Sequence, residues 1–496
     1  MRTVVVGAGL GGLSAAAHLL SDGHEVTVVE RDSVPGGRAG LIERDGFRLD
    51  TGPTVFTMPD LLAATFAAID RELDDYVTID PVDPIYRAMF ADGSELRVRH
   101  GRDAMTEEIR QFANAGEAGA FNEFCEWTTE LYELEMARFI EANFDSPFDL
   151  LKRWRALLDL VRHGGFGALD SKVASFFEDE RLRQVFSFQA LYAGLAPREA
   201  LALYSVITYM DTVAGVFAPR GGVHAIATGL ARAVAEAGAT IRYDTEVSRI
   251  LRDGEGTVTG VDLGGDERLV ADAVVCNADL PVAYRTMLGG VEAPRVARRG
   301  RYSPSCLLWV AGVRGGPPEG AAHHNVHFGN EFDDAFKSVI KRGVRMPEPS
   351  TFVSMASISD PSLAPDGCST LYALEPMPNL DGKLDWAQNG ARYADDLRRR
   401  VGSLGYPVDD VVVERVFDPL DWESMGMERG TPFSLAHTFR QTGPFRPGNV
   451  DERVPGLVFT GSSTVPGVGV PMVLISGKLA ASRVDQYARR TAVLKW

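Results

Sequence analysis

Three glycines near the start of the chain have the spacing of a phosphate-binding loop. Gly7, Gly9 and Gly12 follow the apolar run 3–6 and precede an apolar segment with helical spacing, which gives the pattern GxGxxG. In such a loop the first glycine makes the tight turn and the second lets the backbone approach a pyrophosphate. The third lets the helix pack closely on the strand. The stretch therefore predicts a strand, a loop and a helix that bind a nucleotide.

An acidic residue ends the second predicted strand. Glu30 follows the run 25–29 about 20 residues beyond the loop, where a carboxylate can accept hydrogen bonds from ribose hydroxyls. Its negative charge would repel a 2′-phosphate, which argues against NADP. The two strands, the helix and the acid together favour a dinucleotide site over a chance glycine-rich turn.

The residues after Glu30 separate FAD from NAD. An NAD domain normally continues into a helix, whereas this chain continues with a second Gly-Gly turn and Arg38, whose guanidinium can pair with a diphosphate. The stretch DTGPT then adds Gly52, another glycine that permits close approach. These residues resemble the FAD-binding family that includes amine oxidases, protoporphyrinogen oxidase and carotenoid desaturases. By that resemblance Arg38 neighbours the pyrophosphate, Gly52–Thr54 border the flavin ring, and FAD is the expected cofactor.

A second glycine-rich loop, GSSTVPGVGVPMVLISGKLAA, starts at Gly461 after an apolar run. We expect it to be a second contact with the same cofactor, because no further strand and acid follow it. In the resembling family this loop brings a helix N-terminus to the pyrimidine edge of the flavin, where it favours the anionic charge of reduced flavin. Many members have a Thr-His pair where this chain has Thr464 and Val465, so a proton-transfer role for that histidine is not carried over.

The central part of the chain makes the resemblance more specific. The stretches SKVASFFEDERLRQVFSFQALYAG, APRGGVHAIATGL and PFSLAHTFRQTGPFRP are similar to bacterial and fungal phytoene desaturases, which are FAD-dependent carotenoid dehydrogenases. The likeness covers nearly the whole chain. It implies desaturation of a long apolar carotenoid precursor such as phytoene, with hydride transfer to flavin N5, to a more conjugated, lycopene-type carotene.

Two other functions remain open. One is a related carotenoid isomerase, saturase or oxidase on the same fold. The other is a non-catalytic prenyl-lipid-binding protein of the GDP-dissociation-inhibitor type, which would not need the complete FAD fingerprint that this chain retains.

The predicted fold class is α/β, with a Rossmann-type FAD-binding domain interleaved with a mixed α+β substrate-binding domain, as in amine oxidase-like flavoproteins. Alternating apolar residues with Asp-Gly and Gly-Gly turns after residue 238 predict a β-meander, and residues 91–217 have a mostly helical pattern. The predicted FAD-binding domain comprises residues 1–90, 218–300 and 431–496, and the predicted substrate-binding domain comprises residues 91–217 and 301–430.

The predicted cofactor-binding residues combine the glycine loops with positions implied by the resemblance, by which Val247 contacts the adenine side of FAD. They are Gly7, Gly9, Gly12, Glu30, Arg31, Gly37, Arg38, Gly52, Pro53, Thr54, Val247, Gly461, Ser462, Val470 and Pro471.

The protein must hold a long apolar chain against the flavin and exclude water, since the cofactor carries the redox chemistry. An apolar tunnel is therefore expected. Its candidate walls are Phe176, Phe177, Phe186, Phe188 and Tyr192, although ordinary core packing is the favoured interpretation for any single one.

No catalytic side chain is assigned. His224 follows the PRGG turn and is the first position to test as a base, although a structural histidine is the favoured interpretation. His323, His324 and His327 lie close together, but no matching carboxylate pattern accompanies them. We therefore predict no metal site.

A long hydrocarbon does not leave a bilayer for water, which predicts a membrane-docking helix at Asp149–Leu169. This segment is locally basic and has an apolar stripe at helical spacing. A helix packed on its own domain remains the alternative. The basic residues are Lys152, Arg153, Arg155 and Arg162, and the stripe comprises Leu150, Leu151, Trp154, Leu157, Leu158 and Val161.

Composition narrows the partners and the location. The net charge of −17 argues against a nucleic-acid binder, and the 4 cysteines lack CxxC spacing, which suits a reducing compartment. No apolar run is long enough for a membrane span, and the start of the chain lacks the pattern of a signal peptide. We expect a cytoplasmic protein at a membrane surface that passes electrons to quinone or oxygen.

Overall fold

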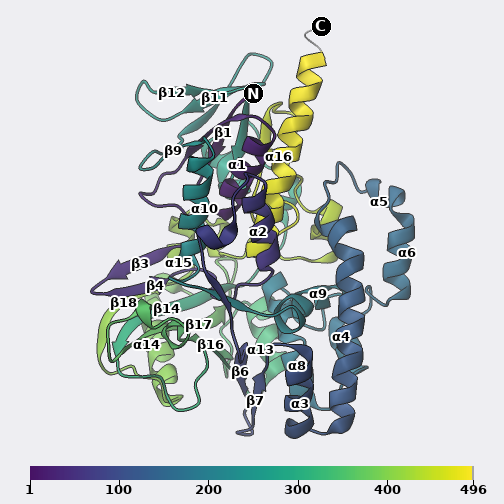
Figure 1. Ribbon diagram of the computed structural model, residues 1–496, viewed down its shortest axis with the longest axis vertical. Coiled ribbons are helices and arrows are strands. Elements are labelled where there is room, and N and C mark those ends of the chain that lie inside the picture. Colours follow the sequence, from purple (N-terminus) through teal and green to yellow (C-terminus); the bar gives the residue numbers. More distant parts are fainter. Residues whose placement is uncertain (494–496) are drawn as a thin grey trace.

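Two sheets organise the chain in the computed structural model, which describes residues 1–493 (Figure 1). Both the parallel sheet, with its helices, and the larger mixed sheet draw on segments far apart in the sequence. In Figure 1 the parallel sheet lies in the upper half and the mixed sheet in the lower half. Residues 494–496 of the predicted FAD-binding domain lie outside the described residues. The predicted domain boundaries remain a prediction.

The first sheet is parallel throughout and contains the strand before the first glycine loop. The central strand β1 is buried at all but its first residue, because it has neighbouring strands on both sides and apolar residues packed on both faces. Its strand order is β19 (Leu457–Phe459), β13 (Ala273–Cys276), β1 (Arg2–Val6), β2 (Glu25–Val29) and β9 (Thr240–Arg242).

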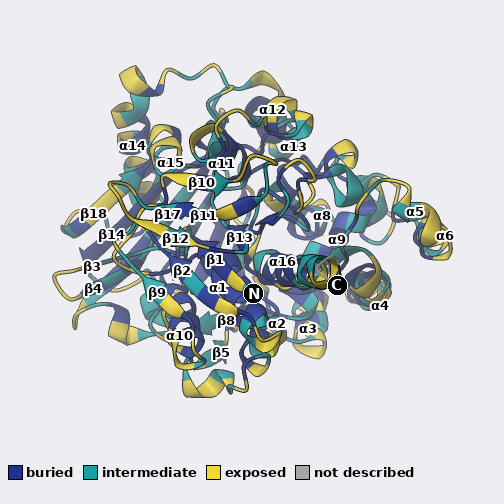
Figure 2. Cartoon of the chain, turned by 90° about the horizontal axis from the view of Figure 1, so that it is seen from above, coloured by how far each residue is buried: buried dark blue, intermediate teal, exposed yellow. Residues whose placement is uncertain are grey.

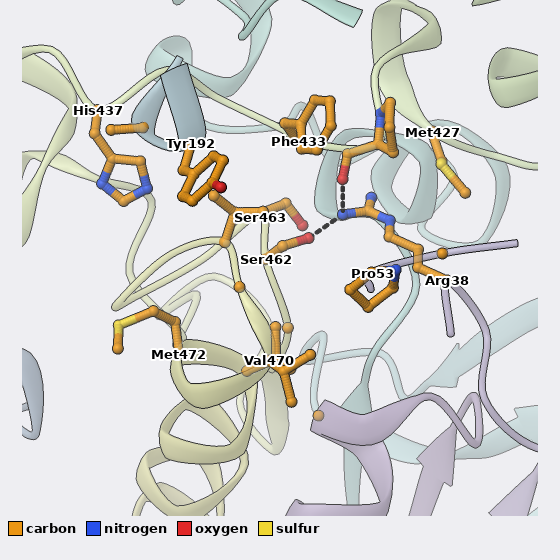
Figure 3. Close-up of a pocket in the computed structure, with 18 of the residues that line it drawn as sticks. Arg38, Pro53, Tyr192, Met427, Phe433, His437, Ser462, Ser463, Val470 and Met472 are labelled. Atoms are coloured by element: carbon orange, nitrogen blue, oxygen red, sulfur yellow. Dashed lines mark hydrogen bonds between the residues drawn. The ribbon is translucent and has the colours of Figure 1, made fainter. Parts of the chain in front are cut away.

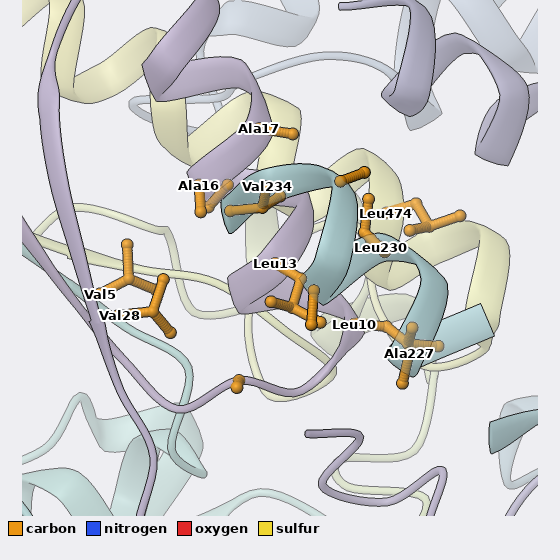
Figure 4. Close-up of a cluster of buried hydrophobic side chains, with 14 of the residues drawn as sticks. Val5, Leu10, Leu13, Ala16, Ala17, Val28, Ala227, Leu230, Val234 and Leu474 are labelled. Atoms are coloured by element: carbon orange, nitrogen blue, oxygen red, sulfur yellow. The ribbon is translucent and has the colours of Figure 1, made fainter. Parts of the chain in front are cut away.

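Small residues on α1 (Leu10–Ser21) allow three helices to pack closely beside this sheet (Figure 4). Alanines of α1 meet α10 (His224–Glu236) and α16 (Val470–Val493), and α2 (Pro59–Ala67) contacts α1 and α16. The side chains in Figure 4 include Val5 and Val28 from the sheet, Leu13 and Ala16 from α1, Leu230 from α10 and Leu474 from α16.

Shorter antiparallel pieces lie outside the two large sheets, and the β3–β4 pair contacts the mixed sheet. The predicted meander forms, but its first expected strand, β9, joins the parallel sheet instead, because it pairs with β2. The meander consists of β10 (Arg249–Arg252), β11 (Val258–Asp262) and β12 (Arg268–Val270). Two further pairs are β3 (Leu41–Arg44) with β4 (Phe47–Asp50), and β5 (Ile79–Pro81) with β8 (Phe217–Pro219).

The second sheet is mixed, with its longest strands at one end. Only β15 and β6 pair in parallel. The strand order is β18 (Val411–Phe417), β14 (Ser305–Arg314), β17 (Cys368–Met377), β16 (Thr351–Ser354), β15 (His324–His327), β6 (Tyr86–Met89) and β7 (Glu95–Val98). The helices α11 (Leu280–Thr286), α12 (Arg295–Arg299), α13 (Phe332–Lys337), α14 (Trp386–Ser403) and α15 (Pro419–Ser424) lie in the sequence around these strands.

The segment predicted to be mostly helical is so, but its helices are interrupted. Two turns are π-helical, an arrangement frequent at functional sites. The elements are α3 (Arg102–Phe112), α4 (Ala115–Glu135), the π-helix η2 (Met136–Ile140), α5 (Asp149–Lys152), α6 (Trp154–Arg162), α7 (Leu169–Ala174), α8 (Glu180–Val185), α9 (Ser205–Thr208) and the π-helix η5 (Tyr209–Val213).

Candidate active site

A continuous cavity of about 1290 Å³ is lined by residues of both sheets and of the helical segment. Every predicted cofactor-binding residue except Gly12 lies on its wall. Gly12 lies behind the loop, where a Cβ would be 2.1 Å from the carbonyl oxygen of Gly7. Its predicted role in close helix packing is confirmed, whereas FAD binding by the residues of the wall remains a prediction.

Glu30 supports the first glycine loop through a hydrogen bond from the loop backbone. One carboxylate oxygen accepts the N–H of Ala8 at 2.6 Å and the other accepts the N–H of Asp32 at 3.0 Å. Burial raises the pKa of Glu30, while these two N–H groups act in the opposite direction. Each oxygen has a further lone pair and the residue lines the cavity, so the arrangement accommodates the predicted bond to a ribose hydroxyl.

Arg38 joins three distant parts of the chain at the cavity. Its guanidinium donates to Asp279 at 3.0 Å. It also donates to the carbonyl of Pro432 at 3.0 Å and to the hydroxyl of Ser462 (Figure 3). Asp279 balances the charge of Arg38, and its other carboxylate oxygen has no partner among residues 1–493. The sequence analysis missed Asp279, although a polar residue shortly after the buried strand β13 is a usable signal.

Gly52 permits a close approach, but within the protein. A Cβ at this position would lie 1.9 Å from the carbonyl oxygen of Arg38. The glycine is therefore required by the turn that carries Arg38, and the interpretation that it makes room for the cofactor has no support from this contact. Its neighbours Pro53 and Thr54 do line the cavity.

The second glycine loop runs from Gly461 to the start of α16 and is held by Arg446. This buried guanidinium donates to the carbonyls of Ser462 at 2.6 Å and Thr464 at 2.9 Å, and also to that of Leu435 at 3.1 Å. Burial lowers the pKa of Arg446 to about 10, which still leaves it charged at neutral pH. A buried cation thus lies directly behind the loop, and the sequence analysis missed it.

The two loops meet, and together they fit FAD. Gly11 approaches Gly461 so closely that a Cβ would be 3.2 Å from the Cα of Gly461, and the amide of Asn277 lies beside both. Around this junction the cavity is lined by Arg38, Asp279 and the first turn of α16, with Pro471 at its second residue. Guanidinium, glycine backbone and a helix N-terminus are the groups that hold a diphosphate and a flavin.

The rest of the cavity is apolar, with walls that differ in part from the prediction. Phe188 and Tyr192 line it. Phe177 and Phe186 do not, because they stack on each other at 4.8 Å in the core, and Phe176 packs edge-on against Phe124 beside them. These three aromatics are core residues, as the interpretation favoured for any single one had it, and they do not form the tunnel wall.

The sequence analysis missed the wall that the mixed sheet provides. Alternate residues of its central strands face the cavity, and the intervening ones pack into a separate core against α14. Because β14 is apolar along almost its whole length, its sequence indicates burial on both faces but not which face borders the cavity. The residues of this wall are Cys306, Leu308, Val326, Phe328, Phe352, Tyr372, Leu374 and Pro376.

The predicted histidines are structural. His224 is buried outside the cavity wall, with Nδ1 2.8 Å from the carbonyl oxygen of Ala39, so the hypothesis that it is the base is not supported. The other three also have hydrogen-bond partners: His323 has Ser359, His324 two backbone carbonyls, and His327 the hydroxyl of Tyr406. Burial lowers the pKa of His324 to about 4.

Three further buried carboxyl or imidazole groups that the sequence analysis missed lie on the cavity wall: Glu135, Asp211 and His437. Glu135 ends α4 beside the π-helix η2, and one of its oxygens has no partner among the described residues. Asp211 lies in the π-helix η5 and accepts bonds from Thr212 at 2.7 Å and Gln189 at 3.3 Å. Burial raises the pKa of Glu135 well above its usual range and that of Asp211 to about 7.

Comparisons with known proteins agree with this geometry. A family model described as "Flavin containing amine oxidoreductase" matches residues 10–485. Phytoene dehydrogenase of Streptomyces griseus is 47% identical over 491 residues, covering 97% of this chain and 95% of its own length. The zeta-carotene-forming phytoene desaturase of Myxococcus xanthus is 37% identical, covering 99% and 95%.

Solved structures share the fold. An oxidoreductase from Methanosarcina mazei superposes with a TM-score of 0.62 at 18% identity, covering 97% of this chain and 100% of its own. Cyclohexylamine oxidase from Brevibacterium oxydans IH-35A has a TM-score of 0.58 at 17% identity, covering 98% and 99%. The predicted α/β flavoprotein fold is confirmed. The chain belongs to the flavin-containing amine oxidoreductase family, within its phytoene desaturase type, and is an FAD-dependent oxidoreductase.

Proposed function

We propose that the protein desaturates a long apolar carotenoid precursor such as phytoene. The observation that carries the proposal is one cavity with polar glycine loops at one part of its wall and apolar side chains over most of the rest. A hydrocarbon chain can lie along the apolar part without losing hydrogen bonds, because it has none to lose. The names of the relatives from Streptomyces griseus and Myxococcus xanthus support the same substrate class.

Different residues of this chain would bind the cofactor and orient the substrate. Glu30 and the first loop would hold the ribose and diphosphate of FAD, and Arg446 and the second loop would hold its flavin end. When bound, FAD takes up the hydride that desaturation releases. Phe188, Tyr192 and the wall of the mixed sheet would orient the hydrocarbon and exclude water.

One experiment tests this function and its alternatives. Purified protein is incubated with FAD, phytoene liposomes and a quinone. The carotenoids are then separated, and their masses are measured by mass spectrometry. Desaturation lowers the mass by two hydrogens per step, isomerisation leaves it unchanged, saturation raises it, and oxygenation adds oxygen. Unchanged phytoene would contradict the proposal. Replacing the quinone by air identifies the electron acceptor.

A binding protein of the GDP-dissociation-inhibitor type is not favoured. Curated relatives named as desaturases or dehydrogenases cover nearly the whole chain, and the predicted FAD contacts gather on one cavity. A colourless preparation that takes up no FAD would favour the binding protein.

We also propose that α5 and α6 attach the protein peripherally to a membrane. The predicted helix 149–169 is broken at Arg153 and ends at Arg162, and its apolar residues face two ways. Leu150, Leu157 and Leu160 line the cavity. The outward residues, which are between 56% and 75% exposed, are Phe148, Leu151, Trp154 and Val161.

This arrangement gives a hydrocarbon a route that avoids water. Figure 1 and Figure 2 show α5 and α6 at one edge of the molecule, and α6 carries exposed residues at that edge. Arg155 lies over the ring of Trp154, 5.3 Å from its centroid, where it can reach lipid phosphates. None of the helices within residues 1–493 combines the length and apolar character that crossing a bilayer requires.

Liposome co-sedimentation tests the attachment. Replacing Leu151, Trp154 and Val161 by serine removes about 0.5 nm² or more of apolar contact and should reduce binding at least tenfold. The matched control replaces Val270 and Leu420, which are exposed apolar residues elsewhere on the surface, by serine. Equal binding by both variants would place the docking surface elsewhere.

A further inference from the structure

Desaturation requires a group that accepts a proton, and the proposed function has so far used none. The cavity wall carries three buried carboxyl or imidazole groups that neither hold the glycine loops nor join the Arg38 network. They are Glu135, Asp211 and His437. A proton acceptor must be unprotonated before the step, reach the cavity and lie near the cofactor loops.

Asp211 and Glu135 satisfy these conditions poorly. Asp211 is engaged by Thr212 and by Gln189, which would have to be released before its carboxylate could turn to a substrate. Glu135 lies in apolar surroundings without a hydrogen-bond partner for one of its oxygens, and desolvation keeps such a carboxyl protonated.

His437 satisfies all three. Its backbone is fixed at both ends, since its N–H donates to the carbonyl of Ala193 at 2.8 Å and its carbonyl accepts from the hydroxyl of Tyr204 at 2.6 Å. The imidazole itself has no hydrogen-bond partner within residues 1–493 and lies at the cavity (Figure 3). Burial and the nearby cation Arg446 lower the pKa of His437, so the ring is neutral at pH 7.

The position of this ring is tied to the second glycine loop. A Cβ on Gly467 would lie 2.2 Å from Cε1 and 2.5 Å from Nε2 of His437, so only glycine at this position leaves room for the imidazole. The ring therefore touches the loop that is proposed to hold the flavin end of FAD. Val465, two residues before Gly467, offers no ionisable group of its own.

We propose that His437 is the catalytic base of the desaturation, an inference that rests on the proposed function. One substrate C–H bond breaks with its electron pair leaving as the hydride that FAD takes up. The C–H bond on the neighbouring carbon breaks with its electron pair becoming the new C=C π bond, and its proton forms an N–H bond on the imidazole. Arg446 then favours release of that proton, because two cations repel. The groups that face the ring are Tyr204 and Arg446.

The test compares His437→Gln with wild type. Glutamine retains a polar side chain of similar length but accepts no proton, so phytoene conversion in a single turnover should fall about 100-fold or more. FAD affinity, measured by fluorescence titration of the apoprotein, should change less than about threefold, because the ring makes no hydrogen bond to the loop. His437→Ala should regain activity when imidazole or a substituted imidazole is added, and the rate should rise with the basicity of the added imidazole.

The matched control is His327→Gln. His327 is also buried but lies on the other side of β15 from the cavity-lining Val326, and it bonds to Tyr406. The His327→Gln variant should be less stable than wild type but should keep the wild-type turnover rate. Conversion by His437→Gln at more than a third of the wild-type rate, or a loss that tracks FAD affinity without rescue, would overturn the role of His437 and leave the function intact. Failure of wild type to convert phytoene would overturn both.

Discussion

The two glycine loops border one cavity but are held by groups of opposite charge. Glu30 supports the first loop with a carboxylate that accepts backbone N–H groups, whereas Arg446 supports the second with a guanidinium that donates to backbone carbonyls. A cation behind a loop stabilises negative charge in front of it. The difference indicates that the first loop serves to position the nucleotide, and that the second is the one suited to negative charge arising during the reaction.

The largest effect should come from removing the cation. Arg446→Met leaves the buried carbonyls of Ser462, Thr464 and Leu435 without their donor, and each such loss costs about 1–3 kcal/mol. We expect the free energy of unfolding in urea to fall by at least about 3 kcal/mol. The exposed Arg440→Met should change it by less than about 0.5 kcal/mol. A loss below about 1 kcal/mol for Arg446→Met would mean that the loop does not depend on this residue.

The next largest effect on stability should come from a substitution at the junction of the two loops. Gly461 has φ of 98°, and a Cβ there would lie 2.7 Å from the amide oxygen of Asn277. Gly461→Ala should cost about 2 kcal/mol or more by thermal or urea unfolding. Gly264→Ala is the control for backbone strain alone, since Gly264 has φ of 88° and nothing within 4 Å of its Cβ position. If both variants lost the same unfolding free energy, the close contact between the two loops would not contribute to stability.

The smallest effect should come from the first loop. Glu30→Gln keeps one oxygen acceptor but turns an amide NH₂ toward a backbone N–H, at a cost of about 1 kcal/mol in urea unfolding. Apoprotein titration should also show weaker FAD binding, since a carboxylate accepts from ribose hydroxyls more strongly than an amide. Unchanged FAD binding would argue against the ribose role.

The same pair of proteins has an expected pH dependence. Because the pKa of Glu30 is raised in the folded state, the folded protein retains a proton that the unfolded chain loses above pH 4.5. The stability that this proton provides is present below the unfolded pKa and is lost as pH rises through the folded pKa. The stability difference between wild type and Glu30→Gln should therefore narrow with rising pH, as urea titrations at several pH values would show.

Local spacing explains which parts were predictable. Gly7, Gly9 and Gly12 and the acid Glu30 lie within one strand–helix–strand unit, so their roles follow from neighbouring residues. The family resemblance then indicated FAD and the second loop, which leads into the N-terminus of α16 as expected.

Long-range partners explain most of what was missed. Arg38 meets Asp279 from 241 positions away, and the Cys306 side of β14 reaches the cavity only because the sheet folds over it. Periodicity alone also failed where a segment is apolar on two sides. The residues of α5 and α6 formed one stripe in the sequence, yet Leu157 faces the cavity and Trp154 faces outward.

The placement of α16 has a consequence for how the protein is made. This helix packs along α1, and a Cβ on Gly477 would lie 2.6 Å from the backbone nitrogen of Ala15. The parallel sheet likewise gains its edge strand β19 from residues 457–459. During synthesis the first glycine loop emerges before these neighbours and remains without them until β19 and α16 have left the ribosome. Only chains that include β19 and α16 should therefore bind flavin, and fragments that stop before Arg446 should not retain FAD.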